Sequence, residues 1–123
     1  MLPDKITAVQ LTQFSKDYAP TVIEVEDSIF KKIESWARAK GIYAKGDPKT
    51  QTLKLLEETG ELAKAILNND QLEIIDAIGD CVVVLTSVAV LCGLNIEDCI
   101  QSAYDVIKNR KGEMKNGTFI KEQ

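Results

Sequence analysis

The chain has 123 residues, of which 45% are hydrophobic and 28% charged, and a net charge of −4 at neutral pH. These values are typical of one soluble globular domain, and the acidic balance argues against a nucleic-acid binder because no basic stripe is available to displace counterions. The sequence contains no histidine, which excludes imidazole acid–base chemistry and histidine-containing triads.

The cysteines and the length of the longest apolar run indicate the cellular compartment of the protein. Cys81, Cys92 and Cys99 form no C-x-x-C pair and lie in apolar segments, as is typical of reduced cysteines inside a cytosolic protein. Residues 1–5 lead into no signal-peptide segment, and the longest apolar run, residues 81–94, is shorter than a membrane span. We therefore expect a cytoplasmic protein with no membrane partner.

The N-terminal third has the weakest pattern. Residues 1–20 are interrupted by Pro20 and are expected to form a short helix or an arm that packs on another subunit. In residues 21–40 the apolar side chains of Ile23, Ile29 and Ile33 keep an approximate helical period, which predicts a helix that ends at Gly41.

Asp47 and Pro48 are a good N-cap and first helical residue, and they predict a helix that runs to residue 67. Gly60 interrupts this helix at a cost of up to about 1 kcal/mol relative to alanine. A missing side chain here permits the close approach of either a ligand or a neighbouring helix.

Asn68, Asn69 and Asp70 form a polar turn before a second helix, residues 70–92, which is nearly apolar after Asp80. Such a helix belongs in the centre of a bundle or at a subunit interface. Asn95 then caps a last helix, residues 96–111, and residues 116–117 mark a turn before a short tail.

No strand-rich region and no internal repeat are predicted. The expected fold is all-α, with four or five helices in a bundle whose core is completed by oligomerisation. The expected divisions are an arm or short helix over 1–20, a helical domain over 21–112 and a tail over 113–123.

Carboxylates are concentrated on one strip of each of the two central helices. The first helix carries Glu57, Glu58 and Glu61, which at about 100° per residue fall within about 100° of arc. The second helix carries Glu73, Asp76 and Asp80, which fall within about 60°. The short turn between the helices makes them antiparallel neighbours, so the two strips can face each other.

Facing strips of like charge need an explanation, because carboxylates at i,i+4 destabilise a helix by roughly 0.2–0.5 kcal/mol and burial increases the penalty. A hard divalent cation removes both penalties, and oxygen ligands without histidine favour Mg²⁺, with Mn²⁺ possible, over zinc. The alternative is a pair of solvated acidic faces paired with Lys54 and Lys64.

The run from Glu57 to Ala63, followed by the run from Glu73 to Asp80, resembles the all-α nucleoside triphosphate pyrophosphohydrolases, and MazG-like proteins in particular. That superfamily includes dimeric dUTPases, dCTP pyrophosphatases and phosphoribosyl-ATP pyrophosphohydrolase. Its signature is Glu-Glu-x-x-Glu on one helix and Glu-x-x-Asp on the next, and the similarity covers roughly residues 30–112. The resemblance also implies association into dimers or tetramers through a four-helix bundle.

The resemblance implies hydrolysis of a nucleoside triphosphate to the monophosphate and pyrophosphate, as in nucleotide-pool house-cleaning. Glu58 and Glu61 match the metal-binding pair of the first motif. The second motif aligns either on Glu73 and Asp76 or on Asp80, and the latter places Ala77 where many members have glutamate. We favour Asp76 and Asp80 as ligands with Glu73 as an outer ligand or base.

A carboxylate not fully used in coordination, Glu57 or Glu58, could orient or deprotonate the attacking water. Cations and amides for the phosphates and base are further candidates, and Trp36 could stack on the base. These substrate-binding candidates are Lys54, Gln51, Trp36, Lys108, Asn109, Arg110 and Lys111. The alternative for each of these residues is an ordinary structural role, either on the solvated surface or in the core.

Two alternatives remain open at the level of sequence. One is a substrate-specific relative, a dUTPase or dCTP pyrophosphatase, because base choice depends on pocket walls that the motif does not describe. The other is a non-catalytic, metal-binding helical interaction module. Ala77 favours this second alternative slightly, and the retention of six acids on two strips argues against it.

Overall fold

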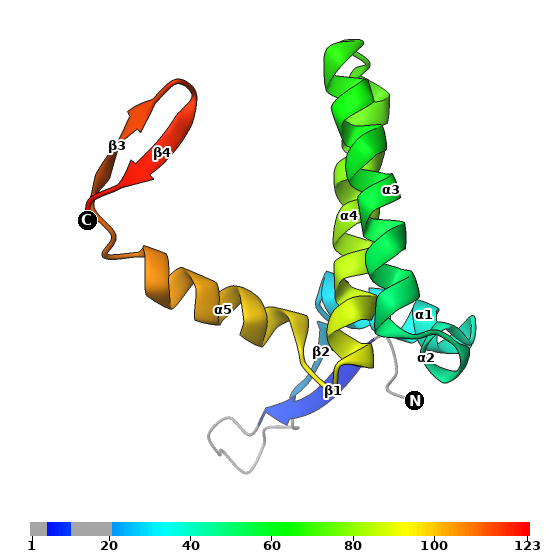
Figure 1. Cartoon of the computed structure of the whole chain (residues 1–123). Helices are drawn as coiled ribbons and strands as arrows, with labels where there is room; N and C mark the ends of the chain where they lie inside the picture. Colours follow the sequence, from blue (N-terminus) through cyan, green and yellow to red (C-terminus); the bar gives the residue numbers. More distant parts are fainter. Residues whose placement is uncertain (1–4, 11–20) are drawn as a thin grey trace.

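The computed structural model describes residues 5–10 and 21–123. Five helices lie between two β-hairpins (Figure 1). In chain order the elements are β1 (Lys5–Gln10), β2 (Thr21–Glu26), α1 (Ile29–Ala39), α2 (Ile42–Lys45), α3 (Pro48–Leu67), α4 (Gln71–Leu91), α5 (Ile96–Ile107), β3 (Gly112–Lys115) and β4 (Thr118–Lys121). The prediction of a helical domain with five helices is confirmed, and the two β-hairpins were not predicted.

The N-terminal hairpin corrects two expectations. β1 and β2 pair antiparallel from Lys5 opposite Glu26 to Gln10 opposite Thr21, so residues 21–26 are a strand and the predicted helix begins only at Ile29. The segment TVIEVE is rich in β-branched residues, which favour strands, and Ser28 starts α1 as its N-cap by accepting the backbone N–H of Lys31 at 3.3 Å. The predicted N-terminal helix is excluded for residues 5–10; residues 1–4 and 11–20 lie outside the described part.

The centre of the fold is the antiparallel pair α3 and α4 (Figure 1). α3 begins at Pro48 as predicted, because the side chain of Asp47 accepts the backbone N–H of Thr50 at 2.8 Å. The turn after α3 contains Asn69 at a positive φ of 53°, and Asp70 caps α4. Ala65 and Ala77 are buried along this pair, and their small side chains allow the two helices to approach closely.

The space around Gly60 is open. An added Cβ there would meet no atom of the chain within 4 Å, so close packing between helices of one chain does not explain this glycine. The approach of a ligand to Gly60 stays a prediction.

The helices α1 and α2 pack against α4 and cover part of its C-terminal half. Gly41 joins them at a positive φ of 81°, in agreement with the predicted end of the preceding helix. The buried apolar residues of the described chain are small: Ala37, Ala65, Ala77, Ala89 and Val84. One chain therefore encloses only a modest core.

The C-terminal part extends away from the α3–α4 pair (Figure 1). α5 ends at Ile107, earlier than predicted, and the expected tail is instead the hairpin β3–β4. Its turn is Asn116-Gly117, with φ of 49° and 80°, and this is the combination that a tight hairpin turn requires. The predicted turn is thus confirmed, but the short strands that it joins were missed.

By length and composition alone α4 could cross a membrane, and about one third of its apolar window is buried in the fold. This is weak evidence, since the core helix of a soluble bundle meets the same criterion. The absence of a membrane partner stays a prediction.

The close approach of α3 and α4 can be tested at Ala77, which is 1% exposed. Replacement by leucine inserts three carbon atoms into this contact, and we expect Ala77→Leu to lower the free energy of unfolding by about 1–3 kcal/mol. The control is Ala63→Leu, at an exposed position of α3, which should change stability by less than about 0.5 kcal/mol. Urea unfolding followed by circular dichroism measures both, and equal stabilities would contradict the packing described.

Candidate active site

Glu58 is the acid most enclosed by the fold. It lies on α3 and is 7% exposed; its Oε1 is 3.4 Å from Nζ of Lys54, whereas its Oε2 is buried with no hydrogen-bond partner among the described residues. Lys54 also contacts Oε1 of Glu57 at 3.2 Å. A buried carboxylate oxygen without a partner costs free energy and therefore marks a place where a ligand would be stabilising.

Asp80 faces this buried acid from α4. Burial raises the pKa of Asp80, and the nearby charges of Asp76 and Glu58 raise it further. The charge of Glu58 likewise raises the pKa of Glu61, with a smaller contribution from Glu57. Of the two predicted strips, Glu58 of α3 and Asp80 of α4 therefore face each other across the helix pair, where their like charges repel.

Glu73 lies further along the same pair, near the turn. It lines, together with Glu61, Lys64 and Asn68, a cavity of about 360 Å³. The six acids thus extend along the α3–α4 pair, with Glu58 and Asp80 at one end and Glu61 and Glu73 at the other. Across residues 5–10 and 21–123, no three acids or cysteines come close enough together to form a ready-made metal site.

A second cavity, of about 350 Å³, is lined by Glu58 and Asp80 and by further residues of the four helices α1, α2, α3 and α4. Three of the candidate substrate-binding residues line it: Trp36 of α1, and Gln51 and Lys54 of α3. Trp36 is 50% exposed, so it is a wall of this cavity rather than a core residue. Carboxylates at one end and an indole at the other suit a ligand that has a charged part and a flat apolar part.

Several residues of this cavity were not predicted from the sequence. They are Ile42, Thr50, Val83, Val84 and Ser87. Ser87 is 2% exposed, and a hydroxyl inside an otherwise apolar helix was a signal that sequence reasoning could have used. Ile42 carried no such signal, because only the fold brings α2 against α4.

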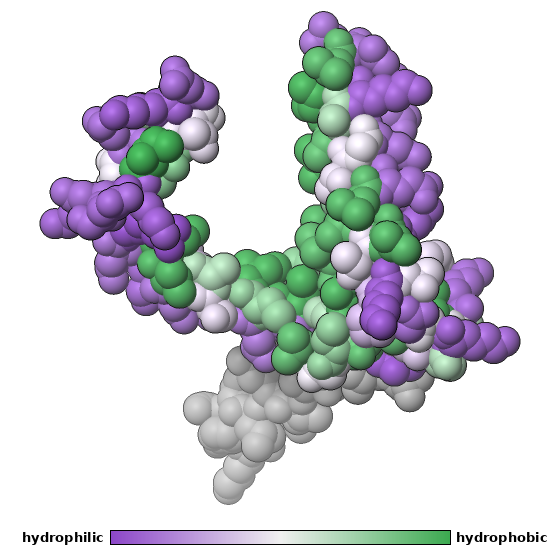
Figure 2. All heavy atoms as spheres, viewed as in Figure 1, coloured by the Kyte–Doolittle hydropathy of each residue, from purple (hydrophilic) through white to green (hydrophobic). Residues whose placement is uncertain are grey.

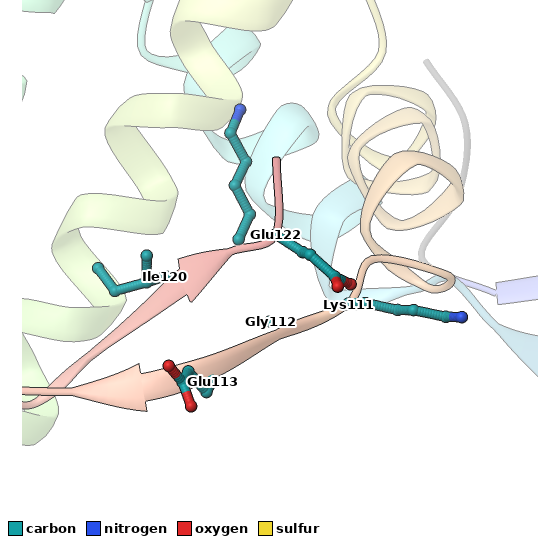
Figure 3. Close-up of a pocket in the computed structure, with 6 residues that line it drawn as sticks. Lys111, Gly112, Glu113, Ile120 and Glu122 are labelled. Atoms are coloured by element: carbon teal, nitrogen blue, oxygen red, sulfur yellow. The ribbon is translucent and has the colours of Figure 1, made fainter.

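The basic residues at the end of α5, which were predicted to bind substrate, do not line either of these two cavities. Asn109, Arg110 and Lys111 line a cavity between α5 and the C-terminal hairpin, and Nζ of Lys108 pairs with Oδ1 of Asp105 at 3.3 Å. Figure 3 shows Lys111 and Glu122 beside the start of the β3–β4 hairpin. Neither acid-lined cavity includes any of these residues, so one chain does not bring them to its own acids.

Comparison with known families identifies the chain. The family profile described as the MazG nucleotide pyrophosphohydrolase domain matches residues 47–114, more than half of the chain. The chain belongs to the MazG family. Members of this family are described as nucleotide pyrophosphohydrolases.

A phage protein is a further relative of this MazG chain. It is described as an uncharacterized 18.2 kDa protein in the rep-hol intergenic region of Haemophilus phage HP1 (strain HP1c1), and it is 39% identical over 61 residues. The match covers 50% of the chain and 37% of the phage protein, so the chain spans about a third of that relative's length. No significant match to a solved structure was found.

The repulsion between the facing acids predicts the effect of removing one of them. Because the pKa of Asp80 is raised in the fold, its charged form is less stable there than in the unfolded chain. Asp80→Asn should therefore stabilise the metal-free protein by a few tenths of a kcal/mol, or about 1–3 °C in Tm. The measurement is thermal unfolding in EDTA, with the exposed Glu122→Gln as an unchanged control; a lower Tm for Asp80→Asn would refute the repulsion.

Proposed function

We propose that the protein hydrolyses nucleoside or deoxynucleoside triphosphates between the α and β phosphates, releasing the monophosphate and pyrophosphate. The observation that carries this proposal is the buried Glu58, whose Oε2 has no partner among the described residues and which lines a cavity together with Asp80 and Trp36. In a MazG family member, the lining of this cavity of about 350 Å³ by Glu58 and Asp80 supports the proposal.

A divalent metal fits the residues present. The donors are all carboxylates, as Mg²⁺ prefers, and the unpartnered oxygen of Glu58 together with the raised pKa of Asp80 indicates a place where a cation is favourable. Glu58, Glu61, Asp76 and Asp80 would hold Mg²⁺ or Mn²⁺, with Glu73 as an outer ligand or base. Bound metal would offset phosphate charge and make a coordinated water more acidic.

The remaining residues position the reactants. Glu57 or Glu58 accepts a proton from the attacking water, whose oxygen bonds to the α-phosphorus while the bond from that phosphorus to the α–β bridging oxygen breaks. Pyrophosphate leaves with that bridging oxygen. Lys54 contacts both glutamates, and its ammonium group would also contact phosphate oxygens of the bound nucleotide.

The nucleobase would occupy the apolar end of the cavity. Trp36 stacks on it, and the amide of Gln51 donates to and accepts from its polar edge. These side chains come from α1 and α3, so they hold the base at a defined distance from the acids. A role in nucleotide-pool house-cleaning in the cytoplasm, as a homodimer or homotetramer, would follow from such a site.

A non-catalytic metal-binding module is the second candidate. It is favoured by the absence of a ready-made cluster of three ligands in the part of the chain that the structure describes. Specificity for one nucleotide, as in dUTPases or dCTP pyrophosphatases, is a narrower form of the first proposal, and it would depend on Trp36, Gln51 and Ser87.

The reaction is tested by product analysis with a panel of canonical and modified nucleotides in Mg²⁺, Mn²⁺ or EDTA. We expect metal-dependent release of monophosphate and pyrophosphate. Glu61→Gln and Asp80→Asn should each lower turnover at least about 100-fold, because each removes charge that holds the metal, while Asp98→Asn on α5 leaves it unchanged. Release of orthophosphate and a diphosphate would show that another bond is cut, and metal binding without turnover would favour the non-catalytic module.

The base site is tested through Trp36, the only tryptophan of the chain. A non-hydrolysable α,β-imido nucleotide should quench its fluorescence by stacking. Loss of stacking is worth about 1–3 kcal/mol, so Trp36→Leu should raise KM about 5- to 100-fold with little change in kcat, and Trp36→Phe should restore most of the affinity. Normal KM in Trp36→Leu would place the base elsewhere.

A further inference from the structure

The cavity beside the facing acids has a mostly apolar far end, in which a few polar groups are placed. Apolar surface alone does not distinguish this cavity, because Figure 2 shows apolar side chains gathered along the α3–α4 pair and along the neighbouring edge of α5. The polar groups of the far end are the amide of Gln51 and the hydroxyls of Thr50 and Ser87. The Thr50 hydroxyl donates to Oδ2 of Asp47 at 2.9 Å. Gln51 and Ser87 therefore remain to recognise a ligand.

Ser87 lies far from the acids along α4. It comes seven residues after Asp80, which places it on the same side of the helix and about 10 Å further along the helix axis. Ser87 is 2% exposed, so its hydroxyl is shielded from bulk water. A nucleotide whose phosphates meet the acids would therefore present to Ser87 the edge of its base that is farthest from the sugar.

The short helix α2 supplies a second buried hydroxyl next to Ser87. Oη of Tyr43 is buried, and it has no hydrogen-bond partner among the described residues. Burial raises the pKa of Tyr43, and the Ser87 side chain is close enough to oppose this rise as a hydrogen-bond partner, although no well-formed bond joins the two hydroxyls. Tyr43 does not line the cavity, so Ser87 lies between the phenol and a ligand.

The charged neighbours of Tyr43 do not accept the proton of its hydroxyl. The guanidinium of Arg38 lies over the ring, 5.2 Å from its centroid, and a guanidinium has no acceptor. The charge of Glu34 raises the pKa of Tyr43, but this carboxylate is paired with Nζ of Lys31 at 3.3 Å. Because a buried O–H without an acceptor costs free energy, donation from Tyr43 to Oγ of Ser87 is stabilising.

Donation from Tyr43 sets the direction of the Ser87 hydroxyl. A phenolic O–H is more acidic than an aliphatic one, so Tyr43 is the better donor of the two. When Oγ of Ser87 accepts this bond, its own proton is left to point into the cavity. The cavity then offers a donor to the far edge of the base. The exocyclic group at that edge is a carbonyl oxygen in uracil, thymine, guanine and hypoxanthine, and an amino group in cytosine and adenine.

We infer that Ser87 is a specificity-determining residue, held by Tyr43 as a positioning residue, and that the two select nucleotides whose base carries a carbonyl group at the edge farthest from the sugar. This inference rests on the proposed function and names its substrate class. An amino group at that edge would meet the Ser87 donor with donors of its own, and both would lose their partners. The neighbouring ring nitrogen also differs between the two classes of base, but the amide of Gln51 both donates and accepts and can turn to match either.

The preference is tested with pairs of substrates that exchange the carbonyl for an amino group. The pairs are dUTP with dCTP, and dGTP with the deoxynucleoside triphosphate of 2,6-diaminopurine. In the wild type, kcat/KM should be at least about 10-fold higher for the carbonyl member of each pair, because the amino member leaves buried donors unpaired. Equal values, or higher values for the amino members, overturn the inference.

Variants at the two hydroxyls test their roles. Ser87→Ala should raise KM for the carbonyl substrates about 10-fold and change kcat by less than about 2-fold, since it removes only a contact to the base. Tyr43→Phe keeps the ring under Arg38 but frees the Ser87 hydroxyl to accept from an amino group, so the preference should fall below about 3-fold. In the Ser87→Ala background, Tyr43→Phe should have no further effect on the preference, because it acts through Ser87.

Matched controls remove the same groups from exposed positions. Ser102→Ala and Tyr104→Phe on α5 should keep the wild-type preference, and circular dichroism confirms that all variants are folded. A merely structural role of Tyr43 or Ser87 would change the kinetics of both members of a pair alike. An unchanged preference in Ser87→Ala or in Tyr43→Phe therefore overturns the inference.

Calorimetry separates the inference from the proposed function. The α,β-imido analogues of dUTP and dCTP have no cleavable α–β bridging oxygen, and in Mg²⁺ the wild type should bind the first at least about 10-fold more tightly. Hydrolysis of all nucleotides without preference overturns the inference and leaves the proposed function standing. If no nucleotide is hydrolysed, the proposed function fails; a measured difference in affinity then supports the inference, and equal affinities overturn it as well.

Discussion

The mutual repulsion of carboxylates between α3 and α4 is the constraint on which the rest of the structure depends. Glu58 is held in a buried position. Burial and the nearby charges of Asp76 and Glu58 raise the pKa of Asp80, so the charged form of Asp80 is disfavoured in the folded chain. Ala65 and Ala77 keep the helices close enough for the strips to interact. Stability is thus reduced at the place where a cation and a polyphosphate would be most favourable, as is common at functional sites.

The same two helices also explain why a single chain has only a small buried core. Among the residues that the structure describes, the buried apolar ones are four alanines and a valine, while large apolar side chains along α4 and α5 remain exposed. A helix pair that presents acids on one side has only its other side left for burial. On α4, the exposed apolar residues Ile75, Ile78 and Leu85 lie roughly opposite Asp76 and Asp80.

The MazG match extends over residues 47–114, from the N-cap of α3 to β3. It contains the acids and the basic end of α5, but not Trp36 or Ile42, which line the apolar end of the cavity. The match therefore includes the candidate metal-binding acids but leaves out the part of the cavity wall that α1 and α2 supply.

The sequence by itself determined the central helix pair, because Asp47, Pro48 and the 68–70 turn act through local hydrogen bonds and backbone preference, and helical periodicity placed the acids on facing strips. It misassigned residues 21–28 and the C-terminal tail, since short strands are stabilised by partners that local pattern does not reveal. Only the tertiary structure decided that Trp36, Gln51 and Ser87 share a cavity with Glu58, and that the basic residues after α5 lie away from the acids of their own chain. Those facts depend on how whole helices pack, which the residues of one segment do not specify.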